Sequence, residues 1–178
     1  MKYVKLFSQD KHVLEMGGGM TCLAGCMLAS SGVTASCHLT DGNINSVHNL
    51  EMIVDKFTKT QKCDGMKAFQ LRWDEDIDQL ESSYDVILCA DCLFFRESLN
   101  SLASSIFTML RAGGVALIAA PSREGTFDVF KSLAEERFSQ VTEMLDYSSE
   151  VSKAHEACLA EPGYKPDIHY PKLMVLKK

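Results

Sequence analysis

Short apolar runs alternate with segments of helical periodicity along most of this 178-residue chain. The apolar runs predict strands at residues 12–16, 37–40, 66–71, 84–90, 115–120, 141–147 and 168–176. Helical spacing predicts helices at residues 20–30, 43–58, 97–110 and 126–137. Strands and helices that alternate in this way build a mostly parallel sheet with helices on both faces. We therefore expect an α/β, doubly wound, Rossmann-like fold with right-handed crossovers.

Two stretches carry most of this topology. The stretch from Asp85 to Ala90 is almost wholly apolar inside, as expected of a central parallel strand that is covered on both faces. The sequence Ala112-Gly-Gly114 interrupts the preceding helical pattern and predicts a break before a strand that begins at Val115. The connection at residues 148–167 is long, and we expect it to be only partly helical.

Length, composition and charge restrict the class of protein. A chain of 178 residues, 46% hydrophobic and 24% charged, is typical of one globular domain. The net charge of −6 argues against a nucleic-acid or anionic-membrane partner. No apolar run reaches the roughly 18 residues of a membrane span, and the first ten residues lack a signal-peptide core. We expect a monomer in the cytoplasm, with the nucleus as a second location.

The cysteines predict reduced thiols. Seven cysteines form an odd set without repeated metal-like spacing, so neither a disulfide framework nor a metal site is expected. Cys89 and Cys92 spell C-x-x-C, but no second pair stands nearby that could complete a zinc site. We interpret both as packing residues, with a redox or metal role as the alternative.

The first candidate site is a loop of three consecutive glycines, Gly17, Gly18 and Gly19, between the first predicted strand and the first predicted helix. Glycine permits unusual backbone dihedrals and lets a ligand approach the backbone, because no Cβ stands in the way. The loop therefore predicts a cofactor site. A merely tight turn is the alternative, since short glycine motifs also occur without a ligand.

An acid at the end of the next strand supports this interpretation. Asp41, followed by Gly42 and Asn43, lies 22 positions after Gly19, where a nucleoside ribose would lie. A carboxylate there can accept hydrogen bonds from both ribose hydroxyls. Asp41 or Asn43 could instead only cap the following helix, although capping and ribose binding can coexist.

Two cofactor classes would use this geometry. A dinucleotide enzyme usually carries G-x-G-x-x-G, but here the third glycine position is occupied by Cys22. The acid Glu15 instead gives Glu15-x-Gly17-x-Gly19, a pattern associated with S-adenosylmethionine. A carboxylate suits that cationic cofactor better than a pyrophosphate, so a nicotinamide-dependent oxidoreductase is the disfavoured alternative.

Three further residues extend the predicted site. Ala90 and Asp91 follow the apolar strand, at the carboxyl edge where open α/β sheets bind their ligands. Trp73, the only tryptophan, follows the third predicted strand and could cover an adenine ring. Core or hinge packing is the alternative for this tryptophan.

Five segments together resemble the calmodulin-lysine N-methyltransferase family of class I, seven-strand protein-lysine methyltransferases. In chain order they are Leu14-Glu-Met-Gly-Gly-Gly-Met-Thr-Cys-Leu-Ala-Gly25, Leu39-Thr-Asp-Gly-Asn43, Leu71-Arg-Trp-Asp74, Cys89-Ala-Asp-Cys-Leu-Phe94 and His169-Tyr-Pro171. The similarity extends from Val13 onward. It implies a class I methyltransferase fold with an antiparallel C-terminal strand, and methyl transfer from S-adenosylmethionine to a lysine of calmodulin.

The resemblance also assigns roles to single residues. It implies that Gly17 and Gly19 hold the methionine end of the cofactor and that Asp41 holds its ribose. Trp73 and Ala90 would border the adenine and the sulfonium. The same site would also include Glu15, Gly18, Gly42 and Asn43. Asp91 and Phe94 match a D-x-x-Y-type motif that borders the incoming lysine, with phenylalanine replacing the more usual tyrosine. We interpret Asp91 as a positioning residue, because an anion near the amine also favours the charged form of lysine.

Two expectations concern the parts outside this motif set. In the family that this sequence resembles, an upstream segment closes over cofactor and substrate. Only about a dozen residues precede the first predicted strand here. The second hypothesis is therefore a cofactor-binding or scaffolding protein without catalysis. Calmodulin is acidic, so its recognition would need a local basic patch. The candidate lysines are Lys56, Lys59, Lys62 and Lys67, or Lys172, Lys177 and Lys178.

Overall fold

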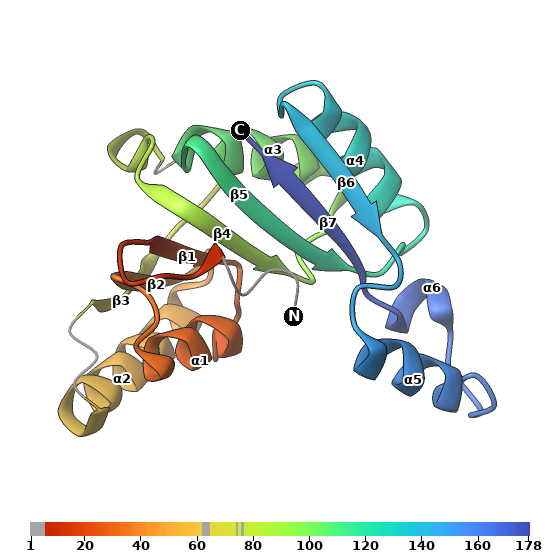
Figure 1. Ribbon diagram of the computed structural model, residues 1–178, viewed down its shortest axis with the longest axis horizontal. Helices are drawn as coiled ribbons and strands as arrows, with labels where there is room; N and C mark the ends of the chain where they lie inside the picture. Colours follow the sequence, from red (N-terminus) through yellow and green to blue (C-terminus); the bar gives the residue numbers. More distant parts are fainter. Residues whose placement is uncertain (1–5, 62–64, 74, 76) are drawn as a thin grey trace.

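The computed structural model describes residues 6–61, 65–73, 75 and 77–178. The predictions that fall on Lys62 and Cys63 lie outside these residues. Within the described part, seven strands form one mixed sheet in the order β3-β2-β1-β4-β5-β7-β6 (Figure 1). Their bounds are β1 His12–Met16, β2 Ser36–Asp41, β3 Met66–Gln70, β4 Tyr84–Ala90, β5 Leu110–Ala120, β6 Gln140–Met144 and β7 Lys172–Lys177.

The pairing of the strands confirms the predicted architecture. Strands β3, β2, β1, β4 and β5 pair in parallel, whereas β7 runs antiparallel to both β5 and β6. Parallel neighbours need crossover connections, and helices α1 Leu23–Ser31, α2 Ile44–Gln61 and α3 Leu99–Met109 form those from β1 to β2, β2 to β3 and β4 to β5. Helix α4 Thr126–Glu135 connects β5 to β6, on the far side of β7. The carboxyl ends of β1, β2, β3, β4 and β5 consequently meet at one edge of the sheet.

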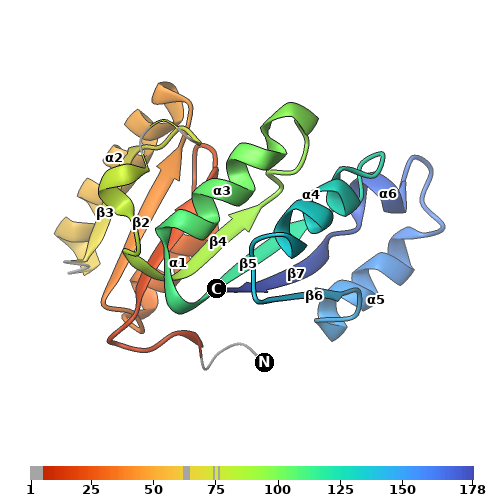
Figure 2. The same ribbon diagram turned by 90° about the horizontal axis from the view of Figure 1, so that it is seen from above.

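The helices cover the two faces of the sheet separately (Figures 1 and 2). Ile87 and Cys89 of β4 belong to the larger core cluster, together with residues of α3 and α4. Val86 of the same strand belongs to a second cluster that includes Cys26 of α1 and Leu50 of α2. Because successive strand residues point to opposite faces, β4 contributes to both cores, as predicted for a central strand.

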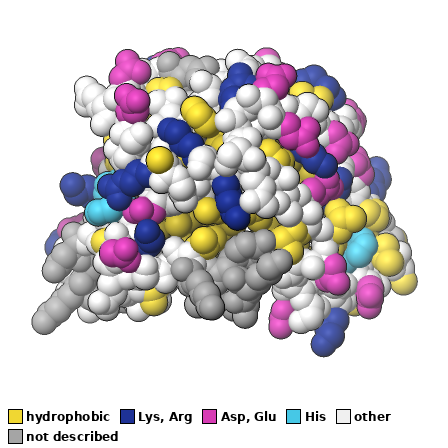
Figure 3. Space-filling model, turned by 45° about the horizontal axis from the view of Figure 1, so that its top comes forward, with side chains coloured by type: hydrophobic (Ala, Val, Ile, Leu, Met, Phe, Trp, Pro, Cys, Tyr) yellow, Lys and Arg dark blue, Asp and Glu magenta, His cyan; other side chains and the backbone are white. Residues whose placement is uncertain are grey.

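A third apolar cluster lies on β5 and β7. Val115, Leu173 and Val175 are buried there, and Leu117 and Tyr147 pack against them. Alternation along the strands places this cluster on the sheet face opposite α3 and α4. Hydrophobic side chains are also visible in the middle of the face seen in Figure 3.

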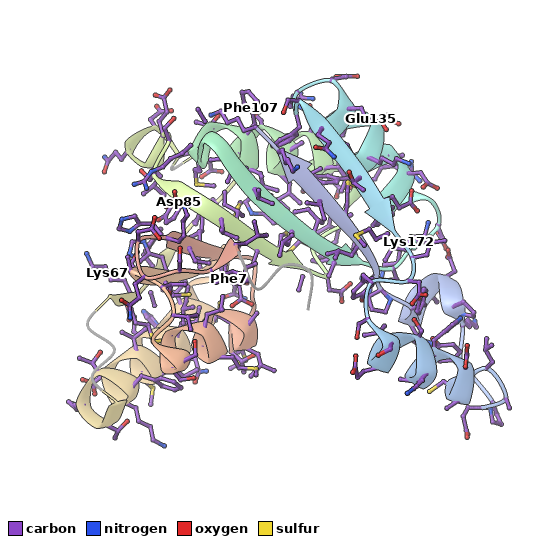
Figure 4. The ribbon with its side chains drawn as sticks, in the orientation of Figure 1. Phe7, Lys67, Asp85, Phe107, Glu135 and Lys172 are labelled. Carbon is purple, nitrogen blue, oxygen red and sulfur yellow. The ribbon has the colours of Figure 1, made fainter. Side chains whose placement is uncertain are left out.

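Polar contacts at the amino end of β4 are structural. Asp85, labelled in Figure 4, lies on β4. It accepts a hydrogen bond from the amide of His12 over 2.9 Å and pairs with Arg111 at 2.9 Å and Lys11 at 3.4 Å. The pKa of Asp85 lies below its ordinary value, because the hydrogen bond from His12 and these two cations outweigh the effect of burial. This cluster joins β1, β4 and β5 at the end of the sheet opposite the glycine loop.

Five predicted boundaries were wrong by at least three residues. Strand β6 ends at Met144 and not at residue 147, and α2 ends at Gln61 and not at residue 58. Helix α1 begins at Leu23 and not at residue 20, because Cys22 precedes it with a left-handed φ of 40°. Strand β5 already begins at Leu110, which pairs with Tyr84 of β4. The register then shifts around Gly113, where φ is 76°, and the pairing resumes at Val115. Strand β7 begins at Lys172 and not at residue 168.

The connection between β6 and β7 holds two helices. These are α5 Ser149–Cys158 and α6 Pro166–His169, so the expectation of partial helical structure is confirmed. Proline at the first position starts α6, since its fixed φ suits a first helical turn and its missing N–H is not needed there. Figure 1 shows both helices beyond the carboxyl end of β6.

Candidate functional site

The glycine loop follows β1 in left-handed conformations. Gly17 has a φ of 61° and Gly19 a φ of 63°, values that favour glycine. A Cβ added at Gly17 would lie 2.8 Å from Sγ of Cys92 and 3.5 Å from Cζ2 of Trp73. Gly17 is therefore required both by its dihedral angle and by the side chains that face it. Gly18 is held from the next strand, because its amide donates to the carbonyl of Thr40 over 3.2 Å.

Asp41 joins the glycine loop to the start of α2. One carboxylate oxygen, Oδ2, accepts the amide of Gly19 at 2.9 Å, and the other, Oδ1, accepts the amide of Asn43 at 2.9 Å. A carboxylate offers about four lone-pair sites, so each oxygen retains one for a ligand. Asn43 itself caps α2, since its Oδ1 accepts the amide of Asn45 at 2.9 Å. Capping and ligand binding are thus compatible here.

Glu15 lies beneath the loop. Its side chain is buried, with the residue only 3% exposed, and its carboxylate accepts the amide of Gly25 at 2.6 Å. Burial raises the pKa of Glu15, and the hydrogen bonds from Gly25 and Ala24 oppose that rise only in part. The carboxylate is therefore directed at the first turn of α1. From this position it supports the loop, and a role in cofactor binding stays a prediction.

Gly25 allows α1 to approach the sheet closely. A Cβ at this position would lie 2.4 Å from Cδ2 of Leu39 and 2.8 Å from Oε2 of Glu15. In dinucleotide-binding loops the third glycine has this packing role. The G-x-G-x-x-G pattern predicts this third glycine at position 22, where the chain has Cys22. In the structure the packing role belongs to Gly25, three residues later. Cys22 is buried, and burial raises the pKa of its thiol.

A cavity of about 360 Å³ opens beside the loop. Five predicted site residues line it: Gly17, Asp41, Gly42, Trp73 and Phe94. The other lining residues were not predicted to belong to the site, and Cys92 was interpreted as a packing residue. They are Leu71, Arg72, Cys92, Phe95, Glu97, Ser98 and Ser101. All seven follow the carboxyl ends of β3 and β4, and this position is the signal that could have found them. The remaining predicted residues do not line it; they are Glu15, Gly18, Gly19, Asn43, Ala90 and Asp91.

A second cavity of about 500 Å³ adjoins the first, because Phe94 and Glu97 line both. Its other lining residues are Arg96, Arg123, Glu124, Thr126, Asp167 and Ile168. They come from the segment between β4 and α3, from the loop after β5 and the first residue of α4, and from helix α6. The two predicted lysine-positioning residues meet here: Phe94 lines the cavity, and Asp91 pairs with the lining residue Arg123 at 3.1 Å.

The described residues offer no metal site or membrane span. No group of three or more His, Cys, Asp or Glu side chains among them could hold a metal ion. No helix in this part of the chain has the length and apolarity to cross a bilayer. The described cysteines are free thiols, and Cys89 and Cys92 are both buried.

Comparison with known proteins decides the family. A family model described as lysine methyltransferase matches residues 4–141, which is more than half of the chain. The chain belongs to the lysine methyltransferase family. The matched region contains the glycine loop, Asp41, Trp73, and the segment from Asp91 to Phe94.

The chain is also similar to a curated protein of the same kind. It is 27% identical over 173 residues to calmodulin-lysine N-methyltransferase from Arabidopsis thaliana. The alignment covers 93% of this chain and 57% of that protein. The chain therefore spans little more than half the length of this relative.

Solved structures support the fold. A methyltransferase from Pyrococcus furiosus superposes with a TM-score of 0.68 at 14% identity, covering 99% of this chain and 79% of that one. Precorrin-6y C5,15-methyltransferase from Geobacter metallireducens gives a TM-score of 0.60 at 11% identity, covering 96% and 82% of the two chains. The predicted class I methyltransferase fold is thus confirmed.

Proposed function

We propose that this protein is an S-adenosylmethionine-dependent protein-lysine N-methyltransferase, and that calmodulin is its substrate. The observation that carries the proposal is the hydrogen bond between Gly19 and Asp41, which brings the glycine loop and the acid of β2 together at one cavity. Membership of the lysine methyltransferase family supports the reaction class. The Arabidopsis relative supports calmodulin as the substrate.

The residues around the first cavity fit this cofactor. The space beside Gly17 is one that a Cβ would fill, Asp41 keeps acceptor capacity for two hydroxyl groups, and Trp73 offers an aromatic face. Gly17, Asp41 and Trp73 would hold the cofactor. When bound, S-adenosylmethionine supplies a methyl group on a cationic sulfur that is already a good leaving group.

The protein's own contribution is alignment and exclusion of water. In-line transfer needs the lysine nitrogen held close to the methyl carbon, and a dry, shaped cavity provides this without acid-base residues. Phe94 and Ile168, which line the second cavity, are 45% and 42% exposed, and Phe95, which lines the first, is 56% exposed. Apolar side chains at the rim can contact the substrate protein and displace water when it docks.

Contacts within the fold reduce the number of lysines that are available to a basic patch for substrate recognition. Lys172 lies 3.2 Å from Glu143, and Nζ of Lys178 donates to the carbonyl of Leu110 over 2.8 Å. Lys59 pairs with Asp55 at 2.6 Å on the exposed side of α2. These lysines already have partners within the fold, so Lys56, Lys67 and Lys177 are the better candidates for contact with an acidic protein.

The test is transfer of a labelled methyl group to purified calmodulin, followed by mass spectrometry of its lysines. We expect methylated lysine with the wild-type protein and, at a cofactor concentration near the wild-type Kd, much less with Asp41→Asn, which removes an acceptor from the cofactor site. Fluorescence of Trp73, the only tryptophan, gives cofactor binding independently, and NAD serves as the competing ligand. Binding of S-adenosylhomocysteine without transfer to any lysine would favour a non-catalytic cofactor-binding protein. Binding of NAD alone would favour an oxidoreductase.

A further inference from the structure

Arg123 forms an ion pair with the predicted lysine-positioning carboxylate. Its Nη2 lies 3.1 Å from Oδ1 and 3.2 Å from Oδ2 of Asp91, so one guanidinium nitrogen contacts both oxygens. Arg123 follows β5 and Asp91 follows β4, which are neighbours in the sheet. The amide of Asp91 extends their pairing by donating to the carbonyl of Ala119 over 2.8 Å. The pair therefore closes the carboxyl end of these two strands.

The loop that carries Arg123 is held in an unusual conformation. Arg123, Glu124 and Gly125 have φ values of 45°, 56° and 80°. Two residues with side chains, Arg123 and Glu124, therefore have backbone conformations in the left-handed region that favours glycine. Such a conformation costs of the order of 1 kcal/mol or more per residue and persists only where surrounding contacts fix it. Strained loops of this kind cluster at functional sites.

Contacts from two other elements fix this loop. Asp167 of α6 binds it twice: its carbonyl accepts the amide of Arg123 at 2.8 Å, and its carboxylate accepts the amide of Glu124 at 3.0 Å. Arg96 donates to the carbonyl of Glu124 over 3.0 Å. These contacts hold the guanidinium of Arg123 beside Asp91. Arg96, Arg123, Glu124 and Asp167 all line the second cavity.

We propose that Arg123 is a positioning residue that fixes Asp91 and offsets its charge, so that Asp91 can orient the substrate lysine without holding it in the protonated form. This inference rests on the proposed lysine methylation. An unpaired carboxylate within ~4–6 Å raises the pKa of an amine by about 1–3 units, and only the neutral amine is a nucleophile. A cation placed on that carboxylate removes most of the rise. The other charged groups that face the same cavity are Arg96, Glu97, Glu124 and Asp167.

The first test compares the pH dependence of kcat for methyl transfer to calmodulin in the wild type, Arg123→Gln and Arg123→Lys. We expect kcat of Arg123→Gln to fall about 10-fold near pH 7 and this deficit to shrink as the pH rises to and above the pKa of the bound amine, since one pKa unit is a tenfold change in the neutral amine. Arg123→Lys keeps the charge and should follow the wild-type profile. A purely structural role would lower kcat of Arg123→Gln by the same factor at every pH, and that result overturns the proposal.

The second test needs no turnover. Binding of n-butylamine, which stands in for the lysine side chain, is measured by ligand-observed NMR on protein saturated with S-adenosylhomocysteine. We expect affinity to rise with pH for the wild type and to fall with pH for Arg123→Gln, because the uncompensated Asp91 then selects the ammonium form. Equal pH dependence in both proteins rejects the role of Arg123. The expected difference without methyl transfer to calmodulin would retain that role and reject calmodulin as the substrate.

Discussion

The amide of Gly19 donates a hydrogen bond to Oδ2 of Asp41 over 2.9 Å, although 22 positions separate the two residues in the sequence. This contact is possible because β1 and β2 are parallel neighbours, so the segments after their carboxyl ends meet. The other oxygen of Asp41 holds the amide of Asn43. One carboxylate thus sets both the shape of the glycine loop and the acceptor atoms that the cavity presents.

Asp41→Asn should weaken cofactor binding more than it weakens the fold. The amide replaces one acceptor oxygen by a donor, which faces either a backbone N–H or a ligand hydroxyl. We expect affinity for S-adenosylhomocysteine to drop about 10- to 100-fold, corresponding to a loss of about 1.5–3 kcal/mol. Calorimetry measures this drop, and Asp55→Asn on the exposed side of α2 is the matched control. Equal affinities of the two variants would contradict a role of Asp41 in the site.

Gly17→Ala should also reduce cofactor binding, for a steric reason. The new Cβ would meet Sγ of Cys92 at 2.8 Å inside the cavity. Gly32→Ala is the control, because Gly32 has nearly the same φ of 64°, no atom within 4 Å of such a Cβ, and a position after α1 that lies outside the predicted site. Both variants carry a dihedral cost of about 1–2 kcal/mol. Both variants should therefore be less stable than the wild type by a similar amount, but only Gly17→Ala should lose affinity for S-adenosylhomocysteine.

The rescue experiment for Gly17→Ala removes the opposing sulfur. In the Cys92→Ala background the nearest atoms to the new Cβ are Cζ2 of Trp73 at 3.5 Å and Cβ of residue 92 at 4.0 Å, which are ordinary contacts. The double variant should therefore bind S-adenosylhomocysteine as well as Cys92→Ala alone. Failure to rescue would show that the dihedral angle, and not the contact with Cys92, determines the requirement for glycine.

Most of the fold was predictable because the strands of the core are short, apolar and separated by helical periods. The strand at residues 84–90 was predicted with its observed bounds, since burial on both faces leaves a continuous apolar run. The sequence did not reveal that Gly113 and Gly114 lie inside β5. Strand pairing held them there: Gly113 and Gly114 exchange backbone hydrogen bonds of 3.1 Å with Lys178, which is remote in sequence. Local glycine signals cannot show such a contact.

The site was predictable where a motif lies on one loop and less so where it depends on packing. Gly17, Asp41 and Trp73 follow strand ends, and the parallel topology brings them to one cavity. Gly25 was missed as a packing position because the close approach of Leu39 comes from a different strand. Arg123 was missed because its partner Asp91 lies 32 positions away, and no local pattern links the two.

Gly25→Ala should destabilise the protein, although alanine normally favours a helix. Overpacking of a buried site costs about 1–3 kcal/mol, which exceeds the gain of up to about 1 kcal/mol in helix propensity. The side chains that must move are Leu39, at 2.4 Å, and Glu15, at 2.8 Å from the added Cβ. Urea unfolding measures the change. Ser30→Ala on the exposed side of the same helix should stay within about 0.5 kcal/mol of the wild type.

Glu15→Gln should change how stability depends on pH. Burial raises the pKa of Glu15 above its ordinary value of 4.5, so the folded protein binds this proton more tightly than the unfolded chain does. The stabilisation from the protonated form is fully present below about pH 4.5 and is lost as the pH rises through the raised pKa. Glutamine stays neutral, and its amide oxygen can still accept the amide of Gly25. The difference between the free energies of unfolding of Glu15→Gln and of the wild type should therefore increase in favour of the variant as the pH rises from about 4.5 to 7. Urea titrations at several pH values measure this difference, with Glu51→Gln on α2 as the exposed control. A constant difference between Glu15→Gln and the wild type across that range would mean that Glu15 is not the group that burial perturbs.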